Sequence, residues 1–284
     1  MKSINTVVAD IQQVLAGGVE VPQERSTLFG ERLGSFLAER LQDNAPRGTL
    51  RMSNFANPDC KLWYTVNNTE LGEPLSPEAR LKFNYGDIIE EYICFLIEQS
   101  DHDLRHRQLE VQYEGIVGHI DGILDGVLVD VKSCSPRTFD KFRYHQLERD
   151  DPFGYLDQLS LYATALQDHE DLLVKKQIAF LAVDKVDGRV CLDVYNVKQK
   201  DYKSEIIRKT GMLKGDRRPP RQYRPTPFGA SGNQRLPMEC SYCPFFRDCW
   251  KDACGGKGVR TFNYSSGQVH LTHVARVPEV EEIT

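Results

Sequence analysis

The sequence contains no long apolar run. No segment of its 284 residues approaches the roughly 18 apolar residues of a membrane-spanning helix. The N-terminal stretch MKSINTVVADIQQVLAGG also has no uninterrupted apolar core of the secretory type. We therefore expect a cytoplasmic protein without a membrane partner, long enough to bury a sizeable core in one large domain or two small ones.

An overall excess of positive charge is also lacking. The chain has 36 Lys and Arg against 41 Asp and Glu, a net charge of −5, which does not by itself indicate a nucleic-acid-binding protein. The basic residues are nevertheless clustered, because residues 203–224 hold eight Lys or Arg against two acids in a Pro-rich stretch. This pattern indicates a basic loop, and a solvated surface run is the alternative.

A second CxxC pair, which zinc ribbons usually need, is absent. The one pair is Cys240 and Cys243, and Cys249 follows closely. Because eight cysteines without a secretory segment disfavour disulfides, metal or cluster ligation is the leading interpretation. A fourth ligand must come from elsewhere, with Cys254 as the local candidate and Cys60 as the distant one. We expect the remaining cysteines to be ordinary thiols: Cys94, Cys134, Cys191 and, if it is not the ligand, Cys254.

No internal repeat is found, and apolar periodicity alternates between helix and strand. It predicts helices over 3–16, 26–43, 84–100, 155–167 and 199–213. Strands are predicted over 107–115, 118–124 and 126–133, followed by a hairpin over 176–197 that turns at Asp187-Gly188. Residues 134–153 read as a loop or irregular helix, and the tail reads as one more hairpin near Ser266-Gly267. This order of elements indicates an α/β core with a mixed sheet.

The predicted strand GVLVDVKS is apolar enough to be buried on both faces, yet it carries Asp130 and Lys132. Side chains alternate along a strand, so both residues point to the same side. Asp121, across the hairpin, is able to join them. Two carboxylates and the carbonyl of Val131 offer the hard oxygen ligands that a divalent cation prefers. Metal-bound water is a better nucleophile, and Lys132 is able to orient it and stabilise phosphoryl charge. A surface ion pair is the alternative reading of Asp-x-Lys.

Three motifs follow one another in order: Gly118-x-x-Asp121, Asp130-x-Lys132 and Gln158-x-x-x-Tyr162. In this respect the chain resembles the PD-(D/E)xK nuclease superfamily, in its RecB-like exonuclease branch. The resemblance implies a restriction-endonuclease-like α/β core, a central mixed sheet flanked by helices. It also implies that Asp121, Asp130 and the Val131 carbonyl bind Mg²⁺ or Mn²⁺, with Lys132 at the nucleophile. Gln158 and Tyr162, four residues apart on one helix face, would lie around the active site and DNA.

The helix before these strands departs from the commonest family pattern. That pattern often has a glycine followed four residues later by histidine, whereas Gly86 here leads to Glu90. Glutamate also occurs at this place in the superfamily and is able to bind the metal directly or through water. We favour Glu90 on register, with Glu91 as the alternative. His119 should share a face with Asp121, and a structural or supporting role is the safer interpretation of it.

A subset of RecB-like nucleases, including CRISPR-associated exonucleases and AddAB-type nuclease domains, carries a 4Fe-4S cluster on one early cysteine and three late ones. The resemblance implies that Cys60, Cys240, Cys243 and Cys249 bind such a cluster. It would join an N-terminal helical region to a C-terminal segment. The expected layout is a helical region at 1–85, a nuclease core at 86–200, a basic loop and cysteine cluster at 201–254, and a tail at 255–284, all forming one compact nuclease domain.

The expected function is metal-dependent exonucleolytic cleavage of single-stranded DNA or duplex ends in recombination, repair or end processing. A structure-specific endonuclease, a CRISPR-adaptation-type trimming nuclease, a catalytically silent DNA-binding or partner-docking protein and a zinc-stabilised protein are the alternatives. The expected partner is DNA, and a homo-oligomer or a recombination-protein partner stays open, as does a bacterial, archaeal or phage-infected host cell. Basic residues expected to follow the phosphate backbone are Arg137, Lys141, Arg143, Arg217, Arg218 and Arg221.

Overall fold

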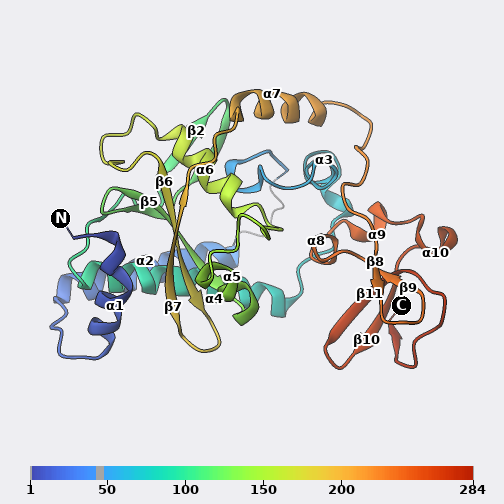
Figure 1. Ribbon diagram of the computed structural model, residues 1–284, viewed down its shortest axis with the longest axis horizontal. Helices are drawn as coiled ribbons and strands as arrows, with labels where there is room; N and C mark the ends of the chain where they lie inside the picture. Colours follow the sequence, from blue (N-terminus) through green and yellow to red (C-terminus); the bar gives the residue numbers. More distant parts are fainter. Residues whose placement is uncertain (1, 43–47, 284) are drawn as a thin grey trace. The chain divides into compact units, whose positions relative to one another are not determined.

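The computed structural model describes residues 2–42 and 48–283 (Figure 1). The chain divides into two compact units. The first contains residues 1–45, 50–56 and 76–207, and the second contains residues 46–49, 57–75 and 208–284. Within the described part of the chain, no helix is long and apolar enough to cross a membrane.

A five-stranded mixed sheet forms the centre of the first unit, in the order β1-β4-β5-β6-β7. The pair β5–β6 is parallel, and the other neighbours are antiparallel. Helices flank this sheet, so the predicted α/β class with a central mixed sheet is confirmed. The strands are β1 (Leu104–Arg105), β4 (Gly122–Leu124), β5 (Val127–Cys134), β6 (Gln177–Asp184) and β7 (Val190–Asn196).

Both faces of β5 are covered, as its apolar sequence predicts. Val129 and Val131 face one buried cluster, which includes Val7 of α1 and Ile97 of α4. Leu128 faces the other cluster, which contains residues of α5 and α6. Asp130 and Lys132 therefore share the α5 and α6 side of the sheet with Leu128. The helices of this unit are η1 (Ile4–Thr6), α1 (Val7–Leu15), α2 (Gln23–Gln42), η2 (Met52–Asn54), α4 (Pro77–Gln99), α5 (Pro136–Arg143) and α6 (Tyr155–Ala165).

The predicted strand over 118–124 is wrong in one respect, because it is two strands in two sheets. β2 (Glu110–Tyr113) and β3 (Ile116–His119) form a separate two-stranded sheet, and β4 begins only at Gly122. Pairing with β2 runs out at His119, where the chain leaves one sheet for the other. Asp121 thus lies at a junction between strands, a position that alternation of apolar residues does not reveal.

The other predicted elements of this unit are present. The helix expected over 84–100 begins earlier, at Pro77, where Ser76 accepts a hydrogen bond from the Ala79 amide and caps it. The ambiguous stretch 134–153 contains α5, which Ser135 caps in the same way. α2 is described to Gln42, and the predicted helix end at residue 43 lies outside the described residues.

The second unit has its own five-stranded antiparallel sheet, in the order β12-β10-β11-β9-β8. The hairpin predicted near Ser266-Gly267 is confirmed as β10 and β11. α7 (Tyr202–Leu213) crosses the division between the units in sequence. The remaining elements are α3 (Asp59–Asn67), η3 (Thr69–Leu71), β8 (Thr226–Phe228), β9 (Asn233–Arg235), α8 (Met238–Ser241), α9 (Phe246–Cys249), α10 (Ala253–Gly256), β10 (Arg260–Tyr264), β11 (Gly267–His273) and β12 (Glu282–Ile283).

The contact between β3 and α6 generates a prediction about stability. A Cβ atom at Gly118 would lie 2.3 Å from the hydroxyl oxygen of Tyr162 and 2.8 Å from Cβ of Met52. Overpacking of this kind costs about 1–3 kcal/mol, so Gly118→Ala should lower the free energy of unfolding by that amount in a denaturant titration. Gly34→Ala is the control, since it meets no atom within 4 Å on α2 and should be neutral or stabilising. Equal stability of the two variants would contradict the packing at Gly118.

Candidate active site and cysteine pocket

Asp130 and Lys132 form an ion pair on β5. Oδ2 of Asp130 lies 2.6 Å from Nζ of Lys132, and the Asp130 residue is only 7% exposed. The ammonium also lies 5.3 Å from the centre of the Tyr155 ring on α6, within the range of a cation–π contact. This is a buried charge pair on a core strand rather than a pair on a solvated surface.

Asp121 is attached to the same strand by a backbone hydrogen bond. The amide of Val131 donates to Oδ2 of Asp121 at 2.7 Å. β4 pairs with β5 only as far as Val129, so this amide has no strand partner on that side. Within a strand, the N–H and C=O of one residue point to the same side, so the Val131 carbonyl faces the side of Asp121. The two aspartates and this carbonyl therefore lie together, as the resemblance implies.

Like charges are crowded at this point of the first unit. Burial, followed by the fields of Asp121 and Asp130, raises the pKa of Glu90 to about 9. Burial and then Asp130 raise the pKa of Asp121 to about 7. Burial opposes the charge of Lys132, but the carboxylates of Asp130 and Asp121 outweigh it and raise the pKa of this lysine. Three acidic side chains thus lie near one ammonium group, and a divalent cation would offset their excess negative charge.

Of the two candidate glutamates on α4, Glu90 is the one in the field of the aspartates. Its Oε1 accepts a hydrogen bond of 2.7 Å from Nε2 of Gln108. Glu91 forms an ion pair with Arg107. Gln108 did not stand out in the sequence, because it belongs to no motif and its left-handed backbone (φ 56°) has no signature in the residue type.

The carboxylates do not form a closed cage of three. In the described parts of the chain, only His106, His169 and Asp171 offer three His, Cys, Asp or Glu ligand atoms within 4.8 Å of one another. The oxygens of Glu90, Asp121 and Asp130 therefore do not all lie within 4.8 Å of one another. Asp121, Asp130 and the Val131 carbonyl offer hard oxygen donors, and a set of this chemistry fits Mg²⁺ or Mn²⁺.

α6 presents one face to this site. Tyr162 is buried, and burial followed by the fields of Asp130 and Asp121 raises its pKa to about 12. Gln158 is half-buried one turn earlier. Tyr155 lies at the same helical face, at positions i, i+3 and i+7 with these two, so helical spacing could have identified it. His119 is directed elsewhere, because Nε2 lies 3.6 Å from Glu110 and Nδ1 lies 3.5 Å from Arg51.

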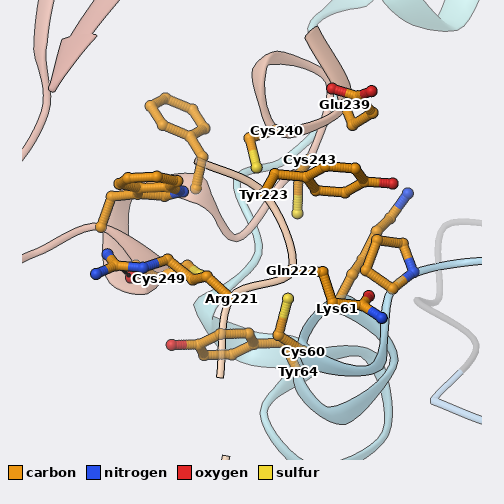
Figure 2. Close-up of a pocket in the computed structure, with 13 residues that line it drawn as sticks. Cys60, Lys61, Tyr64, Arg221, Gln222, Tyr223, Glu239, Cys240, Cys243 and Cys249 are labelled. Atoms are coloured by element: carbon orange, nitrogen blue, oxygen red, sulfur yellow. Dashed lines mark hydrogen bonds between the residues drawn. The ribbon is translucent and has the colours of Figure 1, made fainter. Parts of the chain in front are cut away.

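The four predicted cluster cysteines line one pocket of the second unit (Figure 2). Cys60 lies on α3, and Figure 2 shows its sulfur pointing into the same space as those of Cys240 and Cys243. Tyr64, Phe246 and Trp250 are among the other lining residues. Cys254, the local alternative, lies outside this lining, with its sulfur 3.6 Å from the carbonyl oxygen of Leu271.

The thiols of this pocket differ in acidity, because burial raises the pKa values of Cys240 and Cys243 whereas that of Cys60 is lowered. A hydrogen bond from Cys249, with further donors at Gln222 and Lys61 and the charge of Arg218, lowers the pKa of Cys60 to about 6. Nη1 of Arg218 lies 3.6 Å from Sγ of Cys249. No three of the four sulfurs lie within 4.8 Å of one another.

The basic residues expected to contact DNA differ in their surroundings. On α5, Arg137 and Arg143 are exposed, whereas Nζ of Lys141 lies 2.7 Å from Oδ2 of Asp150. In the second unit, Arg217 is exposed. Arg221 makes paired hydrogen bonds of 2.6 and 2.7 Å to Asp252, and its guanidinium lies 4.2 Å from the ring centre of Trp250.

Comparisons with known proteins agree with the superfamily that the motifs indicate. The family model of the PD-(D/E)XK nuclease superfamily matches residues 59–249, more than half of the chain. No curated protein matches the sequence. Among solved structures, one described as "Crystal structure of SSO0001" is 16% identical, with a TM-score of 0.40, and the match covers 79% of this chain and 95% of that one. On the family match, the chain belongs to the PD-(D/E)XK nuclease superfamily.

Proposed function

We propose that this protein is a divalent-metal-dependent DNA exonuclease that hydrolyses phosphodiester bonds of single strands or duplex ends, in recombination, repair or end processing. The observation that carries the proposal is the set of Asp121, Asp130 and Lys132 at strand β5 of the central sheet. Membership of the superfamily supports a nuclease. The preference for an exonuclease rests on the resemblance of the three ordered motifs to the RecB-like branch.

In this proposal the metal ligands are Asp121, Asp130 and the Val131 carbonyl, with Glu90 acting through a water molecule. Their hard oxygens favour Mg²⁺ or Mn²⁺. A metal bound there supplies a more acidic water and positive charge opposite the phosphoryl oxygens. The protein's own contribution is to hold the two aspartates in place, since the Val131 amide fixes Asp121 and β5 fixes Asp130.

Lys132 would orient the attacking water and donate to a phosphoryl oxygen. Asp130 and the ring of Tyr155 restrict where its ammonium lies, so the donor is in position before the substrate binds. Tyr162 stays a neutral phenol because its pKa is raised, so it is available as a hydrogen-bond donor. Gln158, on the same face of α6, offers amide donors and an acceptor to the DNA.

The first unit also offers charge for the DNA backbone next to this site. α5 begins at Pro136, only four residues after Lys132 in the chain, and carries exposed Arg137 and Arg143. The basic stretch over 203–224 would also bind phosphate through its exposed side chains, among them Lys214, Arg217 and Arg224. Binding through phosphates predicts low sequence preference and strong dependence on salt.

The cysteine pocket would hold a 4Fe-4S cluster on Cys60, Cys240, Cys243 and Cys249. Two features support this: the early-plus-late cysteine pattern and the common pocket. The bound cluster would supply four metal–thiolate bonds that join α3 to α8 and α9 within the second unit. The aromatic lining would limit access of solvent to the thiolates.

Other functions are also compatible with parts of this site. A structure-specific endonuclease or a CRISPR-adaptation-type trimming nuclease would use the same metal and lysine chemistry. A covalently closed single-stranded circle separates them from an obligate exonuclease, which requires an end. A silent DNA-binding protein would bind the same substrates without cutting them.

Replacing the charged pair on β5 tests catalysis. Asp130→Asn removes a metal ligand and Lys132→Met removes the ammonium, while both keep the side-chain volume. We expect each variant to lose at least about 100- to 1000-fold in cleavage rate, because each lost electrostatic contact acts in a buried site. The measurement is digestion of 5′- and 3′-labelled single- and double-stranded DNA with Mg²⁺ or Mn²⁺, using anaerobically purified protein.

Lys185→Met, an exposed lysine at the β6–β7 turn, is the matched control and should cleave like the wild type. Circular dichroism should show folded protein in all three variants. Full activity of Asp130→Asn would remove the basis of the nuclease proposal. Cleavage of a closed single-stranded circle by the wild type would replace the exonuclease with an endonuclease.

The raised pKa values predict how pH acts on the metal-free protein. Glu90 and Asp121 hold protons in the folded state that the unfolded chain, with ordinary values near 4.5 and 3.8, releases. Stability should therefore fall as the pH rises from about 4 towards 9, and Glu90→Gln should flatten this profile in thermal melts. Because the metal must displace these protons, Mn²⁺ affinity measured by calorimetry should rise over the same window. A melting temperature that rises between about pH 4 and pH 9 would contradict the raised pKa values of Glu90 and Asp121.

The cysteine pocket predicts a difference between two serine variants. Cys243→Ser removes a ligand, so we expect it to lose the visible absorbance, the iron and the sulfide of the purified protein and to lower its melting temperature. Cys254→Ser should keep all of them, because Cys254 lies outside the pocket lining. If the anaerobically purified wild type contains zinc but no iron or sulfide, the pocket is a zinc site and the proposal of a cluster is wrong.

A further inference from the structure

A second set of possible metal ligands lies in the first unit, outside the nuclease site. Ligand atoms of His106, His169 and Asp171 all lie within 4.8 Å of one another. His106 follows β1, and the other two residues lie in the connection between α6 and β6. We propose that these three residues bind a zinc ion or a similar transition-metal ion.

The ligand atoms converge, and an ion would replace the hydrogen bond between His106 and Asp171. Nε2 of His106 lies 2.6 Å from Oδ2 of Asp171. The imidazole rings of His106 and His169 are 4.6 Å apart and nearly perpendicular, at 77°, so they meet edge to face rather than stacking. The side chains of His106 and Asp171 are 31% and 22% exposed, which leaves room for water as a further ligand.

Both segments are held in place by the turn between β4 and β5. The Asp125 amide donates to the Asp103 carbonyl at 2.9 Å, next to β1, and the Val174 amide donates to the Gly126 carbonyl at 2.9 Å. The His169 amide also bonds to the Leu166 carbonyl at 2.8 Å. The segments that carry the three ligands are thus tied to this turn by backbone hydrogen bonds of neighbouring residues.

A neighbouring arginine orients the carboxylate. Nη1 of Arg105 lies 2.7 Å from Oδ1 of Asp171, which leaves Oδ2 directed at His106. Supporting contacts of this kind are typical of metal-binding carboxylates.

The ligand types select the metal. Two imidazoles and one carboxylate suit Zn²⁺ and related transition metals, whereas Mg²⁺ and Ca²⁺ prefer oxygen alone. A His–Asp ion pair accounts for His106 and Asp171 but does not need a second imidazole. The ion would cross-link the segment after β1 to the α6–β6 connection. The proposal does not depend on the nuclease activity or on the iron–sulfur cluster.

The test is zinc titration of the full chain, purified anaerobically, with Mg²⁺ in excess to occupy the oxygen site. His169→Asn keeps an acceptor for the Asp171 amide, which now bonds to Nδ1 at 3.3 Å, and removes only the imidazole. We expect this variant to bind one Zn²⁺ fewer per chain, or to bind it more than about 100-fold more weakly, since loss of a ligand exceeds the usual loss from a supporting contact. Zinc should raise the melting temperature of the wild type but not of the variant.

His145→Ala is the matched control. His145 also pairs with an aspartate, at 2.7 Å from Asp193, but it has no second histidine beside it, so its loss should leave zinc binding unchanged. Co²⁺ serves as a spectroscopic probe, because a nitrogen and oxygen site gives no thiolate charge-transfer band. Should His169→Asn be unstable, His106→Gln tests the same site. Equal zinc binding by wild type and variants, or a Co²⁺ spectrum from thiolates alone, would overturn the proposal.

Discussion

The hydrogen bond from the Val131 amide to Asp121 is the interaction on which the active-site geometry depends. β4 ends its pairing at Val129, while β5 continues to Cys134, so the amide of Val131 has no strand partner on that side. A buried amide without an acceptor would cost about 1–3 kcal/mol. Asp121 satisfies it at 2.7 Å, and the same contact holds its carboxylate beside Asp130. The Val131 amide, which has no strand partner, thus determines where the Asp121 carboxylate lies in the site.

The charges at this site are costly because the sheet is buried on both faces. Glu90, Asp121 and Asp130 share one ammonium, and two of these acids have raised pKa values for that reason. Replacing buried charged groups with well-packed apolar residues often leaves the folding stability of a protein unchanged or raises it. Binding of a divalent cation by these acids therefore explains the arrangement better than a contribution to folding stability does. Membership of a nuclease superfamily gives that cation a chemical role.

Local pattern was enough to predict the elements that carry Asp130, Lys132, Gln158 and Tyr162, because strand and helix periodicity fixes which side chains share a face. It failed at residues 119–121, where the chain changes sheets and the apolar pattern continues without a break. Long-range contacts were equally hidden. Gln108, whose backbone is left-handed and which belongs to no motif, donates a hydrogen bond to Glu90. His106 contacts Asp171, which lies 65 residues later in the sequence. Neither contact follows from spacing, since each depends on how loops are held by the sheet.

The basic run over 203–224 illustrates why clustered charge does not define a binding surface. Arg218 faces the sulfur of Cys249, and Arg221 is engaged by Asp252 and Trp250 within the second unit. Thiolates that bind a metal group carry negative charge, and these guanidinium groups lie where they would offset it. Arg221 lines the cysteine pocket, and Arg218 lies against one of its sulfurs. Exposed members of the run, among them Lys214, Arg217 and Arg224, stay available for phosphate, and exposed Arg137 and Arg143 on α5 follow β5 directly.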